Sequence, residues 1–211
     1  MTRIILVRHG QSEANLNKTL AGQSNVPLTP LGQAQANAVA KYIVPGENIT
    51  AVYSSDLDRA YDTALPTAKA LGLSITTDKR LREVDLGALV GHRRDRLERE
   101  FPDFHNTVVE YPALKKYPGG ECPADAYDRI KECICEIAER HHGETVLIAS
   151  HGGIIRRFLF YALGFSRLEE GSVPPIPNTA VSTLEWDGEK MTLLDINSTK
   201  HLEYLPTHTE E

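Results

Sequence analysis

Cysteine is scarce in this sequence, and no run of apolar residues is long. Three cysteines occur among 211 residues, an odd number without CxxC spacing. This predicts reduced thiols rather than a disulfide framework or a zinc knuckle. The longest early apolar run, Ile4 to Val7, is far shorter than the roughly 20 residues of a membrane helix and too short for a signal peptide. We therefore expect a cytoplasmic protein that does not contact a membrane.

Basic residues are fewer than acidic ones, with 23 lysines and arginines against 29 aspartates and glutamates. The formal net charge of -6 argues against nucleic-acid binding, because that function needs a basic face. No GxxxxGK[ST] segment is present, which excludes the commonest nucleotide-binding loop. The histidines show no HxH or HExxH spacing, so we expect neither a metal site nor a cofactor. A small anionic substrate remains compatible, because a local cluster of arginines attracts anions whatever the total charge.

Short apolar runs alternate with helical patterns along the chain. Buried strands are expected at 4–7, 51–54, 73–76 and 146–149. The continuously apolar runs 4–7 and 146–149 are the stronger of these predictions. Strand patterns also flank Asp187-Gly188, which predicts a hairpin over 182–196 at the edge of the sheet. The fold class predicted from this order is α/β, a three-layer α/β/α sandwich with a mostly parallel central sheet and an antiparallel edge strand.

Three helices are predicted between the strands. The first begins at the capping pair Thr29-Pro30, ends near Pro45-Gly46 and carries an apolar stripe of Leu31, Ala34, Ala38, Val39 and Tyr42. The second runs from about 56 to 71, with Pro66 as a kink and Gly72 as its stop signal. The third precedes Gly143, and its stripe consists of Tyr127, Ile130, Ile134, Ile137 and His141.

Nothing in the sequence marks a domain boundary. We find no internal repeat and no low-complexity linker, so residues 1–211 are interpreted as a single domain. Residues 88–121 mix charges without a clear period, and we expect a partly helical insertion there that covers the active site. The tail after His201 is expected to be loose.

Four polar groups follow four of the predicted strands. They are Arg8-His9-Gly10, Arg59, Glu83 and His151-Gly152. Ligands of open α/β sheets bind beyond the carboxyl ends of the strands, so these side chains should converge on one cleft.

These residue types suit phosphate chemistry. Two arginines can hold a tetrahedral dianion, and two histidines can supply a nucleophile and a further donor. Glu83 is the obvious proton source for a departing oxygen. Gly10 and Gly152 would let the backbone approach the phosphate.

Each of these residues also has a structural interpretation. Taken alone, Arg59 suits a solvated helix, Glu83 a surface ion pair and His151 a core histidine. Four such coincidences at four strand ends are less expected than one, which favours the functional interpretation.

Longer motifs surround these residues over nearly the whole chain. They are Leu6–Asn15, Pro27–Thr29 with Gly32, Ser54–Ala60, Leu81–Gly87, Gly119–Glu121 and Ser150–Arg156. In them the sequence resembles the histidine phosphatase superfamily, which includes the cofactor-dependent phosphoglycerate mutases and many small-molecule phosphatases. One departure is Cys122, where relatives often have serine, a better helix cap than a thiol.

The resemblance implies a role for each site residue. His9 would accept the phosphoryl group, and Glu83 would protonate the leaving alcohol and then activate water. The phosphate pocket and substrate contacts would come from Arg8, Asn15, Gly22, Arg59, His151 and Gly152. Arginines can stabilise the charge on the transferred group, so no metal ion is required.

Two departures favour hydrolysis over phosphate transfer between substrate positions. Family mutases have an Arg-Tyr pair after the acid and Asn after the second His-Gly, whereas this chain has Val84-Asp85 and Gly153. We therefore expect a phosphomonoesterase, α-ribazole phosphatase-like or of broad specificity. A phosphoglycerate mutase is the alternative, and a non-catalytic phosphate-ligand or partner-binding protein is the alternative of another class.

The substrate and the oligomeric state stay open. α-Ribazole phosphate, phosphoserine and sugar phosphates are all candidates, and so is a homodimer. A second acidic group on the substrate is suggested by four cations of the insertion, namely Arg93, Arg94, Lys115 and Lys116.

Overall fold

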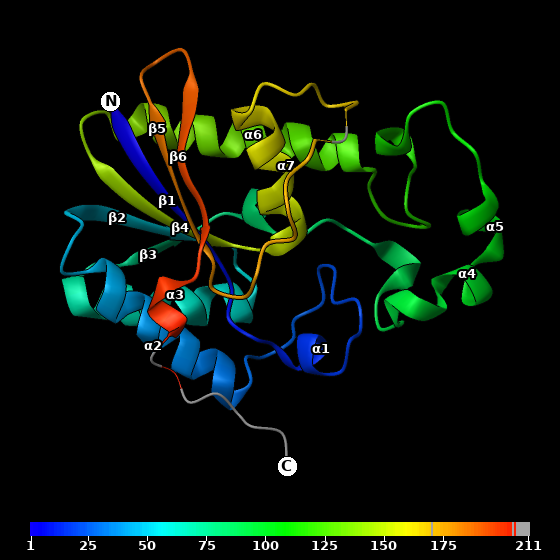
Figure 1. Cartoon of the computed structure of the whole chain (residues 1–211), viewed down its shortest axis with the longest axis horizontal. Helices are drawn as coiled ribbons and strands as arrows, with labels where there is room; N and C mark the ends of the chain where they lie inside the picture. Colours follow the sequence, from blue (N-terminus) through cyan, green and yellow to red (C-terminus); the bar gives the residue numbers. More distant parts are fainter. Residues whose placement is uncertain (170, 204, 206–211) are drawn as a thin grey trace.

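Six strands form one central sheet in the computed structural model, which describes residues 1–169, 171–203 and 205 (Figure 1). The strand order is β3-β2-β4-β1-β5-β6. The parallel strands are β1 (Thr2–Arg8), β2 (Ile49–Ser54), β3 (Ile75–Thr77) and β4 (Thr145–Ser150). The hairpin of β5 (Val181–Trp186) and β6 (Met191–Ser198) adds to β1 in antiparallel fashion. The predicted mostly parallel sheet with an antiparallel edge is therefore confirmed.

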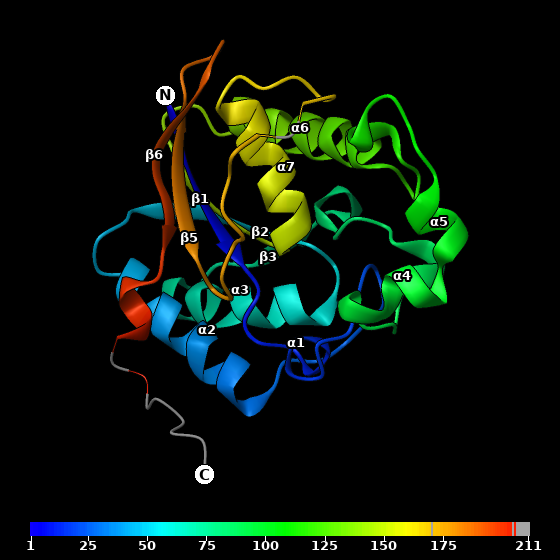
Figure 2. The same cartoon turned by 45° about the vertical axis from the view of Figure 1, so that its right-hand side comes forward.

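Helices cover both faces of this sheet. Alternate residues of a strand point to opposite faces, and β1 is apolar on both. Ile5 and Val7 pack in the cluster that includes α2 (Pro30–Ile43) and α3 (Asp58–Leu71). Ile4 and Leu6 pack in the cluster that includes α6 (Pro123–Arg140) and α7 (Gly152–Ala162). Figures 1 and 2 show the resulting three layers, as predicted.

The buried stripe predicted for α2 is wrong, although its start is confirmed. Thr29 is the N-cap, and its side chain accepts a hydrogen bond from the Gly32 amide. The buried residues are Gly32, Ala36, Val39, Ala40 and Ile43, which share only Val39 with the prediction. Small residues let α2 lie close to α3, while Tyr42 is 46% exposed and its ring lies beside that of His201.

The other two helices follow their predictions closely. α3 ends at Gly72, whose φ of 67° is the left-handed conformation that glycine adopts without strain. In α6 the predicted apolar residues Tyr127, Ile130, Ile134 and Ile137 are buried, and His141 is the C-cap. Cys122 is the N-cap of α6 and forms no side-chain capping bond.

The insertion is partly helical, as predicted. It contains α4 (Leu97–Glu100), α5 (Pro102–Asn106) and two 3-10 turns, a third turn (Gly87–Leu89) lies at its start, and it extends away from the sheet in Figure 1. The short helix α1 (Glu13–Leu16) lies in the loop after β1. Most of the tail predicted to be loose lies outside the described residues. In the described part of the chain, no helix has the length and apolarity needed to cross a membrane.

Candidate active site

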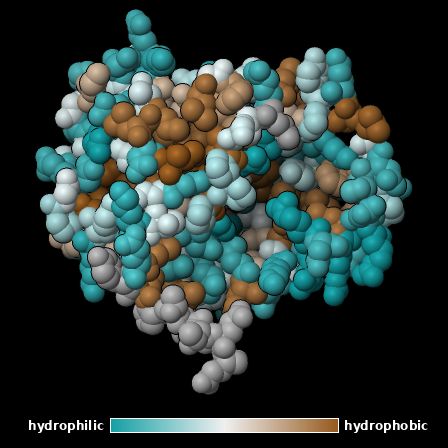
Figure 3. All heavy atoms as spheres, in the orientation of Figure 1, coloured by the Kyte–Doolittle hydropathy of each residue, from teal (hydrophilic) through white to brown (hydrophobic). Residues whose placement is uncertain are grey.

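The four predicted groups meet beyond the carboxyl ends of the parallel strands. A pocket of about 720 Å³ lies there, within the range typical of small-molecule sites. Its lining includes Arg8, His9, Arg59, Glu83 and Gly152. In Figure 3 the surface is hollowed near its centre, beside the mostly hydrophilic surface of the insertion.

His9 directly follows β1 and is held in one tautomer. Its Nδ1 lies 2.7 Å from the carbonyl oxygen of Gly10, which can only accept, so Nδ1 carries the proton and Nε2 keeps its lone pair. The ring is 4% exposed, and burial together with the charges of Arg8 and Arg59 holds its pKa well below the usual 6.5. His9 is therefore a neutral imidazole near pH 7, as a nucleophile must be.

Arg8 and Arg59 bring two positive charges beside that ring. Arg8 donates to the carbonyl of Ile176, and Arg59, which is 1% exposed, donates to the carbonyls of Ser24 (2.7 Å) and Gly22 (2.8 Å). Within the described part of the chain neither forms an ion pair, and the Nε of each is buried without a partner. Burial lowers the pKa of Arg59 to about 10, which leaves it cationic at neutral pH. Two cations without a carboxylate partner can bind an anion.

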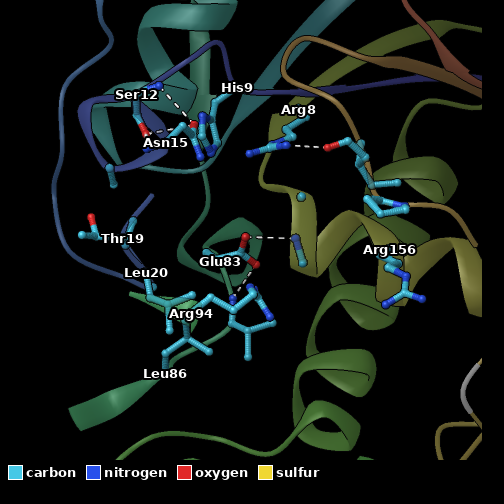
Figure 4. A pocket seen from close by; sticks show the side chains of 18 of the residues that line it. Arg8, His9, Ser12, Asn15, Thr19, Leu20, Glu83, Leu86, Arg94 and Arg156 are labelled. Atoms are coloured by element: carbon cyan, nitrogen blue, oxygen red, sulfur yellow. Dashed lines mark hydrogen bonds between the residues drawn. The ribbon is translucent and has the colours of Figure 1, made fainter. Parts of the chain in front are cut away.

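Glu83 comes from an irregular segment and lines the same pocket, beside the start of α7. Its Oε1 accepts from the amides of Val84 (2.8 Å) and Ile154 (2.9 Å), and its Oε2 accepts from Gly153 (3.0 Å). The surface ion pair considered for Glu83 is absent among the described residues, since Arg80 and Arg82 pair with other carboxylates. Figure 4 shows Glu83 between His9 and Arg94.

His151 caps the same helix and lies behind the pocket surface. It is 0% exposed, its ring centroid is 5.2 Å from that of His9, and its Nε2 is 2.9 Å from the Ser55 hydroxyl. Burial and the charge of Arg59 lower its pKa well below 6.5. Its Nδ1 is buried without a partner among the described residues, so it is not a satisfied core histidine.

This geometry agrees with what the chain is similar to. Residues 4–199 match the family described as "Histidine phosphatase superfamily (branch 1)". The chain belongs to the histidine phosphatase superfamily. It is 33% identical to phosphoglycerate mutase-like protein 4 of Arabidopsis thaliana, over 95% of this chain and 86% of that one. It is 31% identical to phosphoserine phosphatase 1 of Hydrogenobacter thermophilus, over 96% of this chain and 95% of that one.

A solved histidine phosphatase structure extends the likeness to the fold. The mycobacterial glucosyl-3-phosphoglycerate phosphatase, solved with VO3, superimposes with a TM-score of 0.82 and 26% identity, over 93% of this chain and 99% of that one. The family and the fold class predicted from the sequence are thus confirmed.

The glycines of this histidine phosphatase site leave space for other protein groups, and the close approach of phosphate expected at Gly10 and Gly152 stays a prediction. A Cβ on Gly10 would lie 2.5 Å from the Gly32 carbonyl oxygen, so Gly10 makes room for the start of α2. A Cβ on Gly152 would lie 3.1 Å from Nε of Arg8. Gly22, with a φ of 49°, offers its carbonyl to Arg59. These glycines shape the cavity around the two arginines.

Two residues with no predicted role hold the histidines. Ser55 bonds His151, and its place directly after β2 was a signal, since it lies in a motif of the family. Asn178 donates through Nδ2 to the carbonyl of His9 (3.0 Å) and to Oδ1 of Asn15 (3.1 Å). Asn178 lies in an irregular segment before β5, where no pattern distinguishes it.

Of the four cations noted in the insertion, only Arg94 lines the pocket. Arg93 pairs with Asp95, and Lys115 lies over the ring of Phe104. In the part of the chain that the structure describes, no three His, Cys, Asp or Glu side chains are grouped as metal ligands.

Proposed function

We propose that this protein is a phosphomonoesterase that hydrolyses a small phosphorylated metabolite through a phosphohistidine at His9, without a metal ion. One observation carries the proposal: a neutral imidazole with a free Nε2 lies beside the buried Arg59 and the half-buried Arg8, which have no carboxylate partner among the described residues. The relatives named as phosphatases support the same reaction.

In the first step, Nε2 of His9 attacks phosphorus while the bond to the leaving oxygen breaks. Arg8, Arg59 and His151 would stabilise the charge on the transferred group, and Glu83 gives its proton to the departing alcohol. In the second step Glu83 takes a proton from water, the oxygen of which attacks the phosphohistidine. Inorganic phosphate leaves, and His9 and protonated Glu83 are restored.

The remaining site residues act on this machinery through their contacts. Asn15 joins the loop after β1 to Asn178, Gly22 orients Arg59, and Gly152 leaves space for Arg8. We further propose that the whole chain is one domain and that its insertion over 88–121 covers the active site, since Arg94 and Tyr117 come from it. The homodimer and the cytoplasmic location stay predictions.

A second anionic group on the substrate is part of the proposal. Arg94 and Arg156 line the pocket beyond Glu83, which is the only acidic residue among the described lining (Figure 4). Arg94→Met should reduce kcat/KM for substrates with such a group and spare simple monoesters. Arg93→Met is the matched control, because Arg93 is occupied by Asp95. Equal effects of both variants would contradict this assignment.

The test of the reaction is turnover of p-nitrophenyl phosphate in EDTA. Wild-type protein should hydrolyse it, His9→Ala should not, and rapid quench with radiolabelled substrate should leave an acid-labile, base-stable label on His9. Phosphate binding without turnover would favour the non-catalytic alternative. Label that passes to a phosphoglycerate rather than to water would favour the phosphoglycerate mutase alternative.

A further inference from the structure

The loop that carries Glu83 has little regular structure of its own. Residues 83–86 belong to no helix or strand, so their backbone groups need partners from elsewhere. A proton donor must also be held within a fraction of an ångström of its working position. The backbone of this loop therefore depends on hydrogen bonds from neighbouring elements.

Arg129 of α6 supplies most of the donors. Its Nη1 donates to the carbonyls of Arg80 (2.6 Å) and Arg82 (3.0 Å), and its Nη2 donates to the carbonyl of Glu83 (3.3 Å). The planar guanidinium presents donors in fixed directions, which a lysine could not reproduce. One side chain therefore binds three carbonyls along the segment that leads to Glu83.

Glu121 completes the arrangement from the other side. Its carboxylate accepts from Nη2 (2.6 Å) and Nε (3.2 Å) of Arg129, and its Oε1 also accepts from the amide of Asp85 (2.9 Å). The amide of Glu121 returns a bond to the Asp85 carbonyl (3.0 Å). The backbone is thus bound on both sides of Glu83, at 80–83 by Arg129 and at 85 by Glu121.

We propose that Arg129 and Glu121 are positioning residues for the proton transfer, an inference that rests on the proposed function of Glu83. Neither is among the residues that line the pocket. They hold the Glu83 backbone, while the amides at the start of α7 hold its carboxyl group. Loss of the Arg129 bonds lets the loop shift and moves the carboxyl group away from the leaving oxygen.

The experiment compares esters with different leaving groups in Arg129→Met. An alkyl phosphate needs its oxygen protonated as it departs, whereas p-nitrophenolate is stable without a proton. The expected loss in kcat/KM is roughly 10- to 100-fold for the alkyl ester and less than about 3-fold for p-nitrophenyl phosphate. Arg140→Met is the control, because Arg140 lies on the same helix and contacts Tyr53 at the far end.

A double-mutant cycle separates positioning from general damage. In the Glu83→Gln background, Arg129→Met should cause no further loss for the alkyl ester, because the proton donor is already absent. An additive loss, or equal losses for both esters in the single variant, would overturn the proposal. If wild-type protein itself forms no phosphohistidine, the proposed function fails instead, which distinguishes the two failures.

A second variant guards against misfolding. Glu121→Gln keeps the volume and one acceptor, so it should fold and show the same leaving-group effect to a smaller degree. Inhibition by inorganic phosphate should be unchanged in both variants if the arginine pocket is intact. Unchanged leaving-group dependence in Glu121→Gln, with normal phosphate inhibition, would also count against the proposal.

Discussion

Substitution of Gly153 by alanine tests the position of the proposed proton donor, Glu83, from the side of α7. A Cβ at this position would lie 2.6 Å from Oε1 and 3.2 Å from Cδ of Glu83. Ordinary contact begins near 3.4 Å, so the carboxyl group must retreat by about 0.8 Å. Its bonds of 2.9 and 3.0 Å to the Ile154 and Gly153 amides would then exceed normal hydrogen-bond length.

The expected cost follows from this displacement. A shift near 1 Å at a catalytic group can reduce the rate by about 100-fold, which corresponds to about 2.7 kcal/mol of transition-state stabilisation. The loss should appear in kcat/KM for an alkyl phosphate, since that constant reports the steps through phosphoryl transfer. For p-nitrophenyl phosphate, kcat/KM should change little, and a burst should show slow hydrolysis of the phosphohistidine.

The stability of the variant provides the control measurement. Gly153 has no left-handed φ, and the gain in helix propensity from alanine, about 1 kcal/mol, offsets the lost hydrogen bonds of Glu83, so the melting temperature should change little. Gly46→Ala is a matched control because a Cβ there meets nothing within 4 Å. If Gly153→Ala reduces kcat/KM equally for both esters, or for neither, Glu83 is not the leaving-group acid and the reasoning is refuted.

Three further predictions concern the histidines. Because the pKa of His9 is held well below 6.5, kcat/KM corrected for substrate ionisation should show no loss of activity near pH 6.5; a limb at that pH would contradict a neutral buried nucleophile. Burial lowers the pKa of His201 to about 4, so between pH 6.5 and 4 the unfolded chain binds a proton that the folded chain does not. The urea concentration at the unfolding midpoint should therefore decrease as the pH is lowered from 6.5 to 4. His201→Gln should weaken this pH dependence, and an unchanged dependence would contradict the prediction. Asn178→Ala should slow phosphohistidine formation about tenfold through loss of the His9 carbonyl bond, with phosphate inhibition unchanged, as measured by rapid quench.

Local patterns were sufficient to predict the sheet and the meeting of the four groups. A continuous apolar run marks a buried parallel strand, and residues that follow such strands meet at one edge of the sheet. This is why His9, Arg59, Glu83 and His151 could be grouped, although His9 and His151 are 142 positions apart in the sequence. The prediction needed only the parallel direction of these strands, which the structure confirms; their order in the sheet was not predicted.

Features that depend on long-range packing could not be predicted in this way. The buried face of α2 depends on how closely α3 approaches, and the sequence of α2 alone offers two faces of small residues. Asn178 acts on His9 across 169 positions, and no periodicity points to such a bond. Gly10 is required by the carbonyl of Gly32, a contact that exists only once α2 has packed beside the loop.

The two chemical tasks proposed for this site are supported mainly by different layers of the fold. The anion site depends on Arg59 from α3 and on the loop that contains Gly22, whereas the proton donor depends on the amides of α7 and on Arg129 from α6. One hydrogen bond joins these supports, from Nε2 of Gln23 in the loop that contains Gly22 to the carbonyl of Glu83 (3.1 Å), whereas α3 lies on the opposite face of the sheet from α6 and α7. A change in one layer should therefore alter phosphate binding, and a change in the other should alter leaving-group dependence. Gly153→Ala acts on the side of α7, through contact of its Cβ with the Glu83 carboxyl group, so its main effect is expected in proton transfer.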